Sequence, residues 1–313
     1  MATLRAKNLA LAISSCSDVC TAISDKNHPC HKVVDWQANQ HKPQITEVSG
    51  SKLHRPEAWT GDLEKAKIIF LSSNPSFNSV EQFPNWNEIE WSDETISRFG
   101  AERFISFPDR GFGALDSSDS TLRDRTIGLN RELSELVKHW SWARRYAAYV
   151  LNKDISKTSA ISDYVMTELV HCKSFSEVGV MQALFHCSSK WFERMMEISP
   201  AKLIFVGGKP AAIAFVEMFK EQVPSNWGPW QDLEMHGLKG VFPKSVKHLR
   251  HLIENKKWGV EEQKGNMCKV EIGGQSRLVV YIARPGGHGL TAPWNHPELV
   301  HPEILKLWRD QIS

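Results

Sequence analysis

The sequence has few of the features that mark a membrane protein or a strongly basic nucleic-acid binder. No run of about 18 apolar residues occurs, and the short apolar stretch near the N-terminus does not resemble a signal peptide. The 38 basic and 36 acidic residues leave a net charge of +2, so affinity for nucleic acid has to come from local basic patches. The six cysteines include no Cys-x-x-Cys pair. We expect a cytoplasmic protein with no membrane partner, predict no protein partner, and favour thiols or metal ligands over disulfides.

Four short apolar runs are spread along the chain, and helical stretches separate them. The runs are residues 68–71, 164–170, 202–207 and 277–283. Strands that alternate with helices pair in parallel through right-handed crossovers. We therefore predict an α/β fold, a three-layer αβα arrangement around a central, mainly parallel four-stranded sheet. A helical, cysteine-bearing extension (1–58) precedes this domain (59–313), which carries a long insertion at 77–160.

Each predicted strand runs into a small or polar loop, and such loops line the ligand-binding edge of an open α/β sheet. Asn74 follows the first strand and can orient a water, or it can serve an Asn-Pro turn. Glu168 lies in an otherwise apolar strand, where a carboxylate needs either a ligand or a structural ion pair. Arg284 and His288 follow the last strand in a loop that could stabilise negative charge, or that is a plain glycine-rich connection.

Cysteines are candidate metal ligands, and basic residues are candidate phosphate contacts. Cys172 follows the second predicted strand directly, Cys187 lies fifteen residues on, and Cys20 and Cys30 are near the N-terminus. Three or four thiolates from two distant segments could enclose zinc or an iron–sulfur cluster, and buried inert thiols are the alternative. Basic residues that could contact phosphates gather at 138–145 and 244–257, although solvated helix faces have the same composition.

In this order and strand context, the motifs resemble those of the uracil-DNA glycosylase superfamily. The loop Ser-Ser-Asn-Pro-Ser at 72–76 resembles the first motif of that family, and 164–173 resembles the strand that bears its base-recognising Asn. Residues 202–208 resemble the third strand with its glycine turn, and 283–288 resemble the final motif, normally His-Pro-Ser or His-Pro-Gly. The similarity covers residues 60–290 with large insertions.

The resemblance implies an enzyme that hydrolyses the N-glycosidic bond of a flipped-out base in DNA. The implied catalytic residues are Asn74, Arg284 and His288. The implied base contacts are Ser73, Pro75, Phe77 and Glu168. The implied DNA contacts are Lys173, Lys209, Gly286, Gly287 and Leu290. The implied ligands of a structural iron–sulfur cluster or zinc are Cys20, Cys30, Cys172 and Cys187, with Cys16 or His31 as substitutes. No cofactor is required for the chemistry.

Three departures from the family pattern bear on the substrate. Asn74 stands where the fastest members carry Asp, and Arg284 falls where the final motif has His, with His288 displaced four residues along. Glu168 replaces the amide that would recognise uracil, and an ionised carboxylate suits the N4 amino group of cytosine better. We predict a modified or damaged base, a cytosine derivative ahead of uracil, in phage defence or base excision repair. The alternatives are a non-catalytic DNA-binding module on the same fold and a flavodoxin-like small-molecule enzyme.

Overall fold

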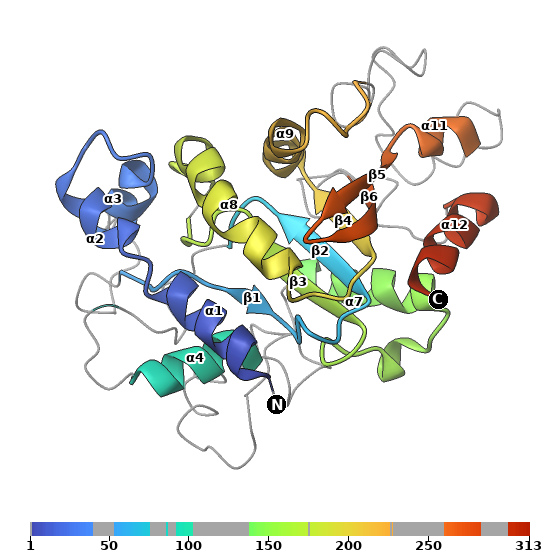
Figure 1. Ribbon diagram of the computed structural model, residues 1–313, viewed down its shortest axis with the longest axis horizontal. Helices are drawn as coiled ribbons and strands as arrows, with labels where there is room; N and C mark the ends of the chain where they lie inside the picture. The colour runs from blue at the N-terminus through green and yellow to red at the C-terminus, as the bar shows by residue number, and fades with distance from the viewer. Residues whose placement is uncertain are drawn as a thin grey trace.

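The computed structural model describes residues 2–39, 53–75, 86, 92–102, 138–174, 176–225, 227, 260–282 and 300–313. A mixed six-stranded sheet forms its centre, with strand order β1-β3-β2-β4-β6-β5 (Figure 1). The strands are β1 (Trp59–Thr60), β2 (Ile68–Ser72), β3 (Tyr164–Glu168), β4 (Leu203–Gly207), β5 (Met267–Ile272) and β6 (Gln275–Ile282). The four inner strands pair in parallel, whereas β1 and β5 pair antiparallel at the two edges.

The α/β class is confirmed, and the four predicted strands are the inner strands β3, β2, β4 and β6. The predicted sheet of four strands is incomplete, because β1 and β5 extend it to six and make it mixed. β1 is two residues long, and β5 alternates buried and exposed side chains, so neither is the continuous apolar run by which the inner strands were found.

Helices cover both faces of the sheet (Figure 1). The helices are α1 (Leu4–Ser14), α2 (Asp18–Ser24), α3 (His31–Asn39), α4 (Asp93–Glu102), α7 (Lys138–Leu151), α8 (Val180–Met196), α9 (Lys209–Met218), α11 (Val260–Lys264) and α12 (Pro302–Ile312), with the 3-10 turn η3 (Ile155–Lys157). Successive residues of a strand point to opposite faces. Ile69 and Leu71 of β2 accordingly pack in a core with α1, α3, α8 and α9, while Ile68 and Phe70 pack in a second core with α7 and α12.

The N-terminal helices belong to the first of these cores. Ile13 of α1 and Val33 and Val34 of α3 are fully buried among residues of α8 and of the sheet. The first 39 residues therefore contact the sheet domain through apolar side chains, close to the carboxyl end of β3.

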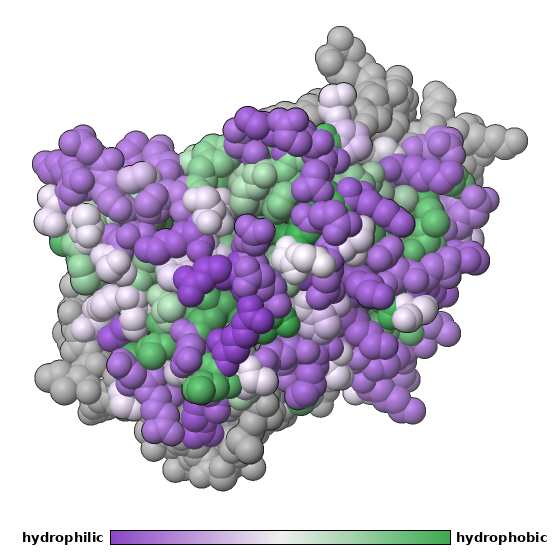
Figure 2. Space-filling view, viewed as in Figure 1, coloured by the Kyte–Doolittle hydropathy of each residue, from purple (hydrophilic) through white to green (hydrophobic). Residues whose placement is uncertain are grey.

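The outer surface is mixed in character. Figure 2 shows hydrophilic residues over most of one face, interrupted by smaller apolar patches. Exposed apolar side chains include Met181 and Phe185 of α8. Among the described residues, no helix combines the length and the apolar character needed to cross a membrane.

Candidate functional site

The carboxyl ends of the four parallel strands lie at one edge of the sheet. Ser72 of β2 pairs with Glu168 of β3, and Gly207 of β4 pairs with Ile282 of β6. Pairing continues past the end of β3, where the N–H of Leu169 donates to Ser72 O at 3.0 Å and that of Val170 to Ser73 O at 2.9 Å. Asn74 therefore follows a strand whose last residue is the register partner of Glu168, as the prediction of converging loops requires.

Glu168 is a buried acid at this edge. Its side chain is 8% exposed at the last position of β3. Register partners on parallel strands project from the same face, so Glu168 and Ser72 lie on the face that carries Phe70 and Met166. A carboxylate held there is positioned to accept hydrogen bonds from a ligand at the strand ends.

The loop after β2 is held by hydrogen bonds from its own side chains. The Asn74 amide Nδ2 donates to Pro75 O at 2.9 Å, a bond between neighbouring residues of this loop. Because a carbonyl oxygen can only accept, this bond fixes which way the amide is turned. The Ser73 hydroxyl donates to Glu177 Oε1 at 2.9 Å and lies 3.4 Å from Asn74 Oδ1.

Glu177 was not among the predicted site residues. It brings a second carboxylate to the edge, in the segment between β3 and α8. The sequence marks it weakly, because it is an ordinary acid between Ser176 and Val178 and its pairing with Ser73 depends on an unusual backbone conformation. Ser176 and Glu177 both have positive φ, 51° and 60°, the left-handed region that side-chain-bearing residues rarely adopt.

Four cysteines from two distant segments line one pocket. Cys16 and Cys30 lie in the connections on either side of α2, Cys172 lies in the segment after β3, and Cys187 lies in α8. Cys20, which was predicted as a ligand, is exposed and does not line the pocket, so Cys16 takes its place. The reason is local: α2 buries Val19 and Ala22, which turns Cys20 outward.

The pocket favours neutral thiols when it holds no cation. Burial raises the pKa of Cys172 and Cys187 and raises that of Cys30 to about 12. A metal bound there would replace these protons. Thiolates around one zinc at about 2.3 Å lie about 3.8 Å apart. Among the described residues, the cysteine sulfurs do not form a group of three within 4.8 Å of one another, so the four thiols are not gathered as closely as the ligands of one zinc.

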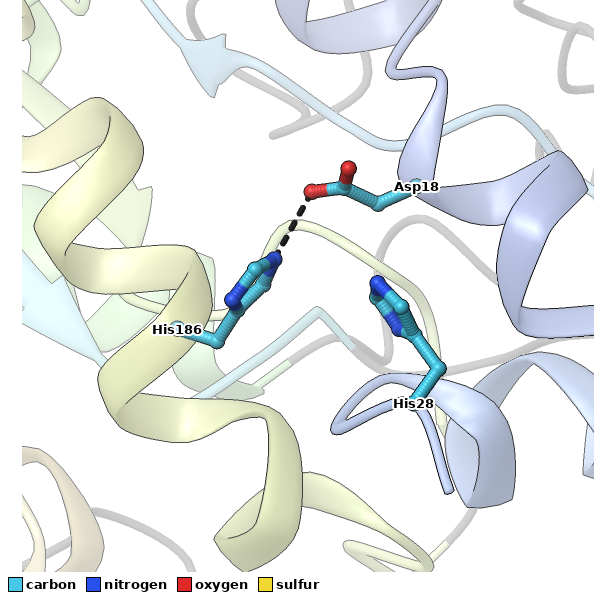
Figure 3. Close-up of side chains that lie close together, drawn as sticks. All are labelled: Asp18, His28 and His186. Atoms are coloured by element: carbon cyan, nitrogen blue, oxygen red, sulfur yellow. Dashed lines mark hydrogen bonds and ion pairs between the residues drawn. The ribbon is translucent and has the colours of Figure 1, made fainter. Parts of the chain in front are cut away.

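A polar group borders the cysteine pocket. Asp18, His28 and His186 bring possible ligand atoms within 4.8 Å of one another (Figure 3). Hydrogen bonds already use these atoms: His186 Nε2 and Lys190 Nζ both donate to Asp18 Oδ2, at 2.9 and 2.8 Å. The backbone N–H of Cys30 donates to His28 Nδ1 at 3.1 Å. Asp18 and His186 also line the cysteine pocket, so their hydrogen bonds form part of its wall.

Two predicted DNA contacts have different surroundings. Lys173 is 2% exposed and its Nζ lies 2.6 Å from Glu57 Oε2, so its prediction as a DNA contact is wrong: the chain folds this lysine inward onto a buried acid. Lys209 is exposed at the first position of α9, beside the carboxyl end of β4. Six predicted site residues lie outside the described residues: Phe77, Arg284, Gly286, Gly287, His288 and Leu290.

Comparison with known proteins does not decide among these possibilities. The side chains described above and their geometry have to support any function. No family model matches the chain, and no curated protein matches it significantly.

Proposed function

We propose that this protein is a DNA glycosylase, a divergent member of the uracil-DNA glycosylase superfamily, that releases a modified cytosine from DNA. The pairing of Ser72 with Glu168 carries the proposal, because it brings the Asn74 loop and a buried acid to the ends of neighbouring strands. The pocket formed by Cys16, Cys30, Cys172 and Cys187 adds support, since the motif resemblance joined the same two segments.

Each side chain has a distinct role in the proposed reaction. The target nucleotide leaves the base stack, and Glu168 accepts a hydrogen bond from the N4 amino group of its base. The N-glycosidic bond breaks with oxocarbenium character at the sugar, and its electron pair leaves with the base. A water that donates to Asn74 Oδ1 adds to the sugar and gives its proton to the departing base. Arg284 or His288 stabilises the charge on that base.

The proposal is tested with DNAs that differ in one base. Duplexes containing cytosine, 5-methylcytosine, 5-hydroxymethylcytosine, glucosylated 5-hydroxymethylcytosine or uracil are incubated with the enzyme, and mass spectrometry identifies any released base. We expect release from a modified-cytosine duplex, and at least a hundredfold slower release by Asn74→Ala and Glu168→Gln. Glu193→Gln, which neutralises an exposed acid of α8, is the matched control and should keep the wild-type rate.

Two results would overturn the proposal. One is full base release by both Asn74→Ala and Glu168→Gln. The other is binding to these duplexes without release of any base, which would favour a non-catalytic DNA-binding module. For the biological role, we expect the protein to reduce plating of phages whose DNA carries modified cytosine more than that of phages with ordinary cytosine; equal plating would favour base excision repair.

We further propose that the four-cysteine pocket holds a structural iron–sulfur cluster, with zinc as the alternative. The donor set suits such a centre, because four buried thiols from two distant segments line one pocket. Such a centre would link the N-terminal helices to α8 and take no part in bond cleavage. Iron and sulfide analysis of anaerobically purified protein tests this assignment, and stoichiometric zinc without iron would reverse it.

A further inference from the structure

The segment that leads from β3 to α8 is fixed against the loop that bears Asn74. The backbone N–H of Ser174 donates to Pro75 O at 3.1 Å, and the Ser174 hydroxyl donates to Val178 O at 2.8 Å. The Ser73 hydroxyl closes the contact from the other loop by donating to Glu177 Oε1 at 2.9 Å. The carboxylate of Glu177 therefore lies one hydroxyl group away from the amide of Asn74.

The backbone of this segment adopts a conformation that is costly for its sequence. Ser176 and Glu177 have φ of 51° and 60°, although neither is glycine. Gly179 follows with φ of 75°, and a Cβ at that position would lie 2.4 Å from the backbone nitrogen of Val33 in α3. Close packing against α3 thus holds the segment in place. Strain of this kind persists where surrounding structure imposes it, and it is concentrated at functional sites.

The hydrogen bonds around Ser73 compete for one proton. A serine hydroxyl has a single hydrogen, and two acceptors are in reach: Glu177 Oε1 at 2.9 Å and Asn74 Oδ1 at 3.4 Å. The charged, closer carboxylate is the stronger acceptor. Asn74 Nδ2 is engaged by Pro75 O, so the Oδ1 atom is the part of the amide that can take a hydrogen from a water. Without Glu177, the hydroxyl would turn to Oδ1 and occupy it.

We propose that Glu177 is a positioning residue for base release: by holding the Ser73 hydroxyl, it keeps Asn74 Oδ1 available to the attacking water. This inference rests on the proposed glycosylase function. It explains why a glutamate occupies a left-handed position that glycine would adopt at lower cost.

Single-turnover kinetics test the inference on the panel duplex whose base the wild type releases fastest. Glu177→Gly removes the carboxylate and suits the backbone. We expect base release about tenfold slower at saturating enzyme, the effect of one misdirected hydrogen bond, with an unchanged half-saturating concentration and no loss of thermal stability. Glu177→Gln retains an acceptor and should stay within about threefold of wild type. Ser176→Gly relieves the neighbouring strain, keeps the carboxylate and should have the wild-type rate.

A double variant separates positioning from a general structural effect. If Glu177 acts by holding the Ser73 hydroxyl, its removal has no consequence where that hydroxyl is absent. Ser73→Ala and the Ser73→Ala/Glu177→Gly double variant should therefore release base at the same rate, within about twofold. A tenfold loss that persists in the Ser73→Ala background would overturn the inference.

The remaining outcomes distinguish the positioning role of Glu177 from the proposed glycosylase function on which it rests. If Glu177→Gly releases base within twofold of the wild-type rate while Asn74→Ala is inactive, the role of Glu177 is overturned and the glycosylase function is retained. No base release by the wild type from any panel DNA would overturn both.

Discussion

The contribution of the buried Lys173–Glu57 ion pair to stability can be tested by replacing one or both of its partners. Lys173 Nζ lies 2.6 Å from Glu57 Oε2, and the two side chains are 3% and 7% exposed. Glu57 also accepts from the Thr60 hydroxyl at 3.2 Å. Lys173→Met should lower the free energy of unfolding by about 3–5 kcal/mol, because it removes the cation from a carboxylate that water does not reach.

Replacement of both partners should behave differently. In the Lys173→Met/Glu57→Leu double variant no buried charge of the pair remains, and an apolar pair of similar volume is often neutral or stabilising. We expect the double variant to recover most of the loss, measured by urea unfolding with linear extrapolation.

The same variants test the role of Lys173 toward DNA. A lysine that contacts a phosphate lowers the salt slope of DNA binding by about one when it is removed. We expect an unchanged slope for the Lys173→Met/Glu57→Leu variant, because the side chain faces Glu57. A reduced slope, or a loss of less than about 1 kcal/mol in Lys173→Met, would refute the reasoning.

Three further predictions concern the cysteine pocket and the core. If the pocket holds an iron–sulfur cluster, Cys16→Ser should abolish bound iron and lower the melting temperature, whereas Cys20→Ser should retain the wild-type iron content and melting temperature. Equal iron loss in the two purified variants would contradict the ligand assignment. Burial lowers the pKa of His171 from 6.5 to about 4, so the unfolded state takes up a proton first as the pH falls and stability declines by up to about 3 kcal/mol between these values. His171→Gln should flatten that part of the curve in urea unfolding from pH 7 to 4, and an unchanged decline would assign it to other groups. Arg277, fully buried, donates to four backbone carbonyls, so Arg277→Met should lower the free energy of unfolding by about 3–5 kcal/mol; less than 1 kcal/mol would show that water satisfies them.

The inner sheet was predictable because burial on both faces leaves a direct trace in the sequence. A strand covered by helices on either side needs apolar residues at every position, and β2 and β4 have them. β5 was missed because half of its residues face outward. The Gly273-Gly274 turn between β5 and β6 is a hairpin signal that could have revealed it.

The candidate site was predictable where position along a strand decides it. Asn74 and Glu168 follow from the rule that parallel strands end at one edge. Spacing alone did not show that Cys16, and not Cys20, lines the pocket with the other three cysteines. Lys173 was misassigned because a lysine is ordinarily solvated. Glu177 was missed because a left-handed backbone at a non-glycine residue has no sequence signature.

The pocket that joins Cys16 and Cys30 to Cys172 and Cys187 is assembled from segments far apart in the chain. During synthesis the pocket cannot form until α8 has left the ribosome, so the N-terminal segment is synthesised well before Cys172 and Cys187, the cysteines that it faces. The entropy lost in closing so long a loop grows only with the logarithm of its length. A change in the length of the chain between the two halves of the pocket should therefore alter the free energy of its closure only slightly.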